Sequence, residues 1–205
     1  MDEQDERRAA IKRKMDELRE RIRSQPNRPL RARRDRPLPA ALTADLLNAT
    51  PDKGLCGIVA DYVIGQMKAG APAQTPQAVV RGLRAGIRMV YVTRVVDGQV
   101  NNGGFHQFFF NSSGKFAADA IECFNVLGLP AYAELMRRAV ARFAEEGEMQ
   151  SRIREQRNLK TFFESYKETT LGELDKEFYA MEKTQPLEAA RIRYIREHLD
   201  EFVTS

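Results

Sequence analysis

Residues 100–111 read VNNGGFHQFFFN, and the predicted fold depends on this stretch. Asn and Gly tolerate a positive φ, so its NNGG run predicts the end of a helix and a sharp reversal of the chain. Phe105, Phe108 and Phe109 follow at i, i+3 and i+4, which places them on the inward face of a short helix. We therefore expect this stretch to form the structural centre of the molecule.

The amide side chains of this stretch allow two interpretations. Gln107 and Asn111 lie four residues apart on another helix face, where they can bond each other or neighbouring backbone. On the structural interpretation, the amides satisfy exposed backbone groups around the glycines. On the functional interpretation, the glycines permit close approach and the amides face a partner or ligand. The candidate binding residues are Asn101, Asn102, Gly103, Gly104, Gln107 and Asn111.

Helical patterns precede this stretch. Thr43 is a predicted N-cap for a short helix that stops before Pro51. Apolar residues recur at helical spacing over 55–68, and Gly70 is the predicted C-cap of that second helix.

One long helix is predicted to follow, from Thr75 and Pro76 at N-cap and N1 through about Asp97. Its run MVYVTRVV, at 89–96, could alternatively be a strand.

The residues after the stretch are also typical of helices. No pair of strands with hairpin turn chemistry is evident, so the predicted class is all-α, with a compact multi-helix domain over residues 41–205. The expected helices cover 115–127 with Gly128 as the stop, 130–147 opened by Pro130, 171–183, and a final segment after Pro186.

Residues 1–40 have a different character and are expected to form a basic, partly disordered helical arm. Residues 2–23 carry a two-heptad apolar seam, which fits either packing on the domain or a homodimer. Residues 24–39 are rich in proline and arginine, which predicts a linker.

The positive charge of the chain lies mainly in this arm. Of a net +4, residues 1–40 contribute 13 Lys and Arg against 8 Asp and Glu. Unstructured arginines can neutralise the phosphates of nucleic acid without reading its sequence, although this arm has no aromatic residues for base stacking. The alternative nucleic-acid-binding residues are Arg28, Arg31, Arg33, Arg34 and Arg36.

Several functional classes receive little support. No apolar run approaches the roughly 20 residues of a membrane span, and the N-terminus has no apolar targeting segment. Cys56 and Cys123 fit reduced core residues of a cytoplasmic protein.

Catalysis is not expected either. His106 and His198 are the only histidines, and neither has a nucleophile or metal-ligand partner at an informative spacing, so we expect no catalytic residue, metal site or cofactor. Asp175 and Glu177 are expected to be a surface or capping pair between the core residues Leu174 and Phe178.

The sequence VNNGGFHQFFFN resembles the signature of a bacterial domain family known for a DNA-mimic protein. LGELDKEFYAME at 171–182 and YIREHLDEF at 194–202 also match that pattern, and the resemblance covers roughly residues 55–203. It implies a non-enzymatic, all-helical domain that binds another protein. The family's described member imitates DNA phosphates with surface carboxylates and so sequesters a transcriptional regulator.

This chain departs from that pattern in its charge. Residues 145–182 interleave ten acidic with six basic residues, whereas duplex DNA carries about one negative charge per 1.7 Å of its axis. We therefore expect a domain that binds a protein partner, with nucleic-acid binding through the arm as the alternative.

Overall fold

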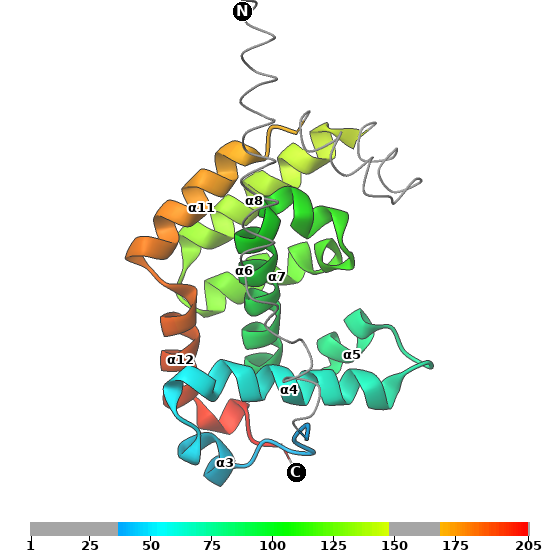
Figure 1. Ribbon diagram of the computed structural model, residues 1–205, viewed down its shortest axis with the longest axis vertical. Helices are drawn as coiled ribbons and strands as arrows, with labels where there is room; N and C mark the ends of the chain where they lie inside the picture. Colours follow the sequence, from blue (N-terminus) through cyan, green and yellow to red (C-terminus); the bar gives the residue numbers. More distant parts are fainter. Residues whose placement is uncertain (1–36, 148–168, 205) are drawn as a thin grey trace, which may run out of the picture. The chain divides into compact units, whose positions relative to one another are not determined.

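The computed structural model describes residues 37–147 and 169–204 (Figure 1). Regular structure within these two ranges is entirely helical, which confirms the predicted all-α class. The described helices belong to one compact unit that begins at Leu38. The predicted helix, apolar seam and arginines of the arm lie outside the described residues.

The first two helices lie close to their predicted positions. Helix α3 spans Ala44–Ala49, and the Thr43 hydroxyl oxygen accepts the Leu46 N–H at 3.1 Å, which confirms the predicted N-cap. Helix α4 spans Asp52–Gly70 and so begins three residues before the predicted range. The prediction of Gly70 as the C-cap is wrong by one residue, because Gly70 is still helical and Ala71 caps the helix.

The predicted long helix is wrong, because two helices replace it. Thr75 and Pro76 do open a helix, but this helix, α5, spans only Pro76–Gly82. Leu83 is extended, with φ −76° and ψ 160°, and α6 then spans Ala85–Phe110. Residues 89–96 lie inside α6, so they do not form the alternative strand.

Contacts with the end of the chain explain this break. Arg84 donates through its guanidinium to the backbone carbonyl of Asp200 at 2.8 Å. Gly86 lies so close to the buried Phe202 ring that a Cβ at this position would be 2.9 Å from it. The start of α6 is therefore set by residues more than 100 positions away, which local periodicity does not encode.

The remaining elements agree with prediction apart from their ends. Gly128 has φ +72° just after α7, and Pro130 opens α8, as expected. Lys115 lies in a short 3-10 helix rather than in the α-helix predicted from that residue. The bounds are η1 Ser112–Phe116, α7 Ala117–Val126, α8 Pro130–Glu145, α11 Gly172–Thr184, α12 Leu187–Glu197 and η2 Leu199–Glu201.

Helix α6 is the central element of this unit (Figure 1). It packs against α4, α7, α11 and α12, and α8 lies beside α11. The two ends of the described domain meet, because the Thr204 N–H donates to the Leu42 carbonyl at 2.8 Å. Every other element of the core is therefore positioned directly or indirectly by α6.

Two further expectations can be compared with the described residues. Cys56 and Cys123 are both free and buried, as expected of core cysteines. Burial raises the pKa of both thiols, that of Cys123 to about 12. No described helix combines the length and apolarity that crossing a membrane requires.

Candidate binding site at the kink of α6

Helix α6 is kinked at a pair of glycines. Gly103 has φ −162° and ψ 29°, and Gly104 has φ 72° and ψ −177°, both outside the helical region. The predicted interruption is therefore present, but the predicted helix end and reversal are wrong, because the helix resumes at Phe105. We call residues 85–102 the first half of α6 and residues 105–110 its second half.

Two side chains of α11 bind backbone groups on either side of the kink. The Phe105 N–H donates to Asp175 Oδ1 at 2.8 Å, and the Tyr179 hydroxyl donates to the Val100 carbonyl at 2.9 Å. In a regular helix, these groups would bond the carbonyl of residue 101 and the N–H of residue 104. Asp175 and Tyr179 are four residues apart, so they share one face of α11. We call this pair the α11 bracket.

Of the two roles predicted for Asp175, surface or capping residue, the surface role is wrong. Asp175 is only 6% exposed, and burial raises the pKa of its carboxyl although the Phe105 N–H acts in the opposite direction. Its Oδ2 atom would lie 2.2 Å from a Cβ on Gly104, so only glycine leaves room for the carboxylate. Glu177, the other member of the predicted pair, is half-buried and bonds Arg138 at 2.8 Å.

Four amide side chains connect the two halves of α6 on its outside. Asn102 donates to Gln107 Oε1 at 3.1 Å, Gln107 donates to Gln99 Oε1 at 3.0 Å, and Asn111 donates to the same oxygen at 2.7 Å. Gln107 and Asn111 therefore meet on Gln99 and do not bond each other in the described structure. We call these four residues the amide strap.

The strap lies at the surface and leaves hydrogen-bonding capacity free for a partner. Asn102 and Asn111 are exposed, and Gln99 and Gln107 are half-buried. Each amide has one carbonyl oxygen and two N–H donors, more than the strap consumes. Gly103 lies directly beneath Gln107, because a Cβ on Gly103 would be 2.3 Å from Gln107 Oε1.

Asn101, the remaining candidate, belongs to a different set of bonds. Its amide donates to the Asp97 carboxylate at 2.6 Å and to the Asp97 carbonyl at 3.0 Å. The other carboxylate oxygen of Asp97 accepts from Arg191, which is 1% exposed, at 2.6 Å. Asn101 is therefore tied to the half-buried Asp97 and its ion pair with Arg191 rather than to the strap.

The aromatic residues of the second half anchor the kink from inside. Phe105 and Phe108 are buried as predicted, and Phe109 is partly buried against the core. Phe105 meets Phe178 of α11 edge to face at 6.0 Å between centroids. His106 is also buried.

The structure thus brings together some predicted residues and adds others. Asn102, Gln107 and Asn111 meet in the strap, and Gly103 and Gly104 form the kink beneath it. Sequence reasoning missed Gln99, Asp175 and Tyr179. Gln99 precedes Gln107 and Asn111 by 8 and 12 residues, which are not whole turns of a helix, and the kink lies between them, so no local spacing indicates it.

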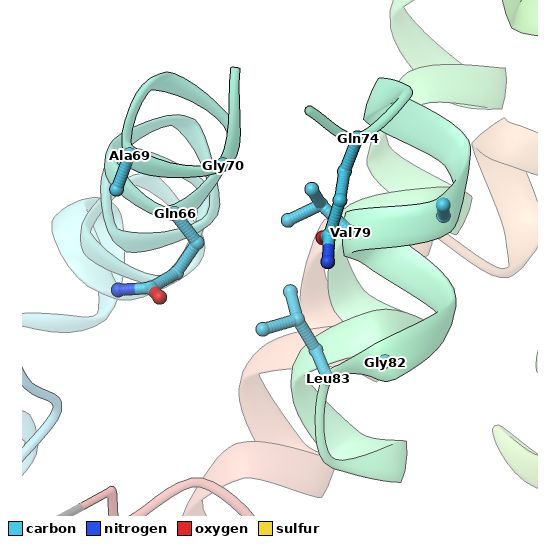
Figure 2. A pocket seen from close by; sticks show the side chains of 8 residues that line it. Gln66, Ala69, Gly70, Gln74, Val79, Gly82 and Leu83 are labelled. Atoms are coloured by element: carbon cyan, nitrogen blue, oxygen red, sulfur yellow. The ribbon is translucent and has the colours of Figure 1, made fainter. Parts of the chain in front are cut away.

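A second surface carries amides in the cleft between α4 and α5 (Figure 2). Gln66 lies on the α4 side of the cleft, and Gln74, Val79 and Leu83 lie opposite it. These amides form no bond across a kink, so they offer a chemically matched comparison for the strap.

Comparison with known proteins shows one family. The family model described as DMP19-like protein matches residues 81–198, more than half of the chain. The match contains the whole kink and α11, whereas most of the α4–α5 cleft precedes it. No curated protein and no solved structure matches the chain.

The close approach at Gly104 can be measured against Gly128, which has the same φ of +72° but nothing within 4 Å of a Cβ placed there. We expect Gly128→Ala to cost about 1 kcal/mol from backbone strain alone. Gly104→Ala should cost a further ~1–3 kcal/mol, because the methyl group overlaps the Asp175 carboxylate and because a φ of 72° with a ψ of −177° is open only to glycine. Urea unfolding followed by circular dichroism measures both, and equal losses would contradict the steric argument.

Substitution of Asp175 separates its acceptor from its charge. Asp175→Ala leaves the Phe105 N–H without its acceptor and should destabilise the fold by ~1–3 kcal/mol, measured by the same urea unfolding. Asp175→Asn keeps an acceptor oxygen without burying a charge, so at pH 7 it should be clearly more stable than Asp175→Ala.

The raised pKa of Asp175 determines the direction in which the stability of the fold changes with pH. Because folding raises the Asp175 pKa, its contribution to stability is fully present below the unfolded pKa of about 4 and is lost as pH rises through the folded pKa. The Asn variant should lack this part of the pH dependence in the same unfolding experiment. An unchanged pH profile would show that Asp175 does not titrate as its burial requires.

Proposed function

The chain belongs to the DMP19-like protein family, and on that premise we propose that it binds a protein partner at the kink of α6. Membership makes it a DNA-mimic-like protein. In our proposal it acts in the bacterial cytoplasm through binding and not through catalysis, and the amide strap forms part of the contact surface.

The exposed amides of the strap are the observation that carries this proposal. Asn102 and Asn111 lie at the surface inside the range that the family model matches. Amide groups donate and accept hydrogen bonds without charge, so they suit the backbone and polar side chains of another protein.

The arrangement of the described carboxylates favours a contact at the kink over a row of acidic residues that imitates the phosphates of DNA. Along α8 and α11, Arg138 pairs with Glu177 and Arg142 pairs with Glu173. Over the described residues, 15 Lys and Arg accompany 17 Asp and Glu. A surface with this balance offers far less negative potential than a DNA duplex.

The proposal is tested by comparing partners of the intact protein and of Asn102→Ala/Gln107→Ala after crosslinking in cells. We expect the double variant to lose a specific partner that the wild type retains. Gln66→Ala/Gln74→Ala removes two amides from the α4–α5 cleft instead and should retain that partner. An identical set of partners for both folded variants would overturn the proposal.

Nucleic-acid binding through the arm is the second candidate, favoured by the charge excess of residues 1–40. Replacement of Arg28, Arg31, Arg33, Arg34 and Arg36 by Gln in the full chain should weaken binding to random-sequence duplex DNA. It should also flatten the salt dependence, by up to ~0.9 in the log–log slope per lost phosphate contact. If the intact protein produces no salt-sensitive gel shift, this candidate fails.

A further inference from the structure

Two sets of hydrogen bonds connect the halves of α6, and they differ in burial and charge. The α11 bracket has one buried arm, the Asp175 carboxylate that receives a backbone donor, and one arm at the surface, the hydroxyl of Tyr179, which is 38% exposed. The amide strap acts from the surface, where Gln99 and Asn102 of the first half bond Gln107 and Asn111. The kink is therefore held from both sides, by chemically unequal contacts.

These contacts also differ in how readily they exchange. A buried bond to a backbone N–H is hard to break, because opening it leaves a donor without water in a medium of low dielectric constant. The strap bonds join neutral groups at the surface, where water or a partner can replace them at little net cost. A rearrangement of the kink therefore begins at the strap.

The glycines supply the backbone freedom that such a rearrangement needs. Gly104 already occupies the left-handed region, and neither glycine contributes a side chain that would wedge the two halves in place. The second half is only six residues long and ends at the Asn111 cap, which itself belongs to the strap.

We propose that the kink is a hinge, with the α11 bracket as its pivot and the amide strap as a releasable lock. The inference rests on the proposed function, because a partner that donates to Gln99 Oε1 or Gln107 Oε1 competes with the strap bonds that use the same oxygens. Partner binding then changes the angle between the two halves, and the strap sets the angle of the free protein.

The expected displacement is measurable. The second half is about 9 Å long at 1.5 Å per residue, so a change of about 20° in the kink moves its end by about 3 Å. Spin labels on Gly98→Cys and Ser112→Cys of the full chain report this distance by pulsed electron paramagnetic resonance. Both positions are exposed, and the native cysteines are buried away from the label.

Three variants in this labelled background address the strap and the bracket separately. Gln99→Ala/Asn102→Ala removes all three bonds of the strap, and Gly103→Ala displaces the Gln107 amide while keeping it in the chain. Both should broaden the distance distribution or shift it by about 3 Å, given the lever length above. Tyr179→Phe removes the bond from the Tyr179 hydroxyl to the Val100 carbonyl. It should increase hydrogen exchange at the Phe105 N–H, which the Asp175 carboxylate still accepts.

Both the control and the result that would contradict the hinge are measured on the free protein. Gln66→Ala/Gln74→Ala should leave the distance distribution as in the unmodified labelled protein. If the strap variants fold normally and also leave it unchanged, the hinge is wrong even where partner loss supports the binding site. If the distance shifts but partners persist, the binding site is wrong and the hinge stands.

Discussion

The bond from the Phe105 N–H to the Asp175 carboxylate is the constraint on which the rest of this structure depends. A break in a buried helix exposes backbone donors that water does not reach, and each must find an acceptor. Here the acceptor comes from a residue 70 positions later. The carboxylate needs the space that a side chain on Gly104 would occupy, so the glycine and the aspartate require each other.

Charged and neutral side chains occupy different places around the kink. The charged groups of Asp175 and Arg191 are buried, and Arg191 pairs with the half-buried Asp97, whereas the strap on the outside consists of neutral amides. Several surface carboxylates are paired with arginines. Isolated surface pairs contribute little to stability, but they reduce the negative potential available to a partner. Shape and hydrogen bonding are then better sources of specificity than charge.

Features that neighbouring residues determine are predicted correctly from the sequence, whereas features that distant contacts determine are not. Thr43 at an N-cap, Pro130 at a helix start and the Phe105–Phe108 spacing are local signals, and each predicts its feature correctly. The break before α6 and the burial of Asp175 depend on contacts with residues far along the chain. The pattern around Asp175 is typical of a surface acid, because the spacing of apolar residues does not show that α6 and α11 meet at this position.

Family membership and the geometry of the kink answer different questions. The matched range makes the chain DMP19-like and includes both members of the Phe105–Asp175 bond, yet a fold hosts many partners. The kink itself presents surface amides that are bonded to one another across a pair of glycines. Any partner that takes those bonds changes the free energy of the kink, and by linkage the kink changes the affinity for that partner by the same amount. Binding strength and hinge angle are therefore one coupled property of α6.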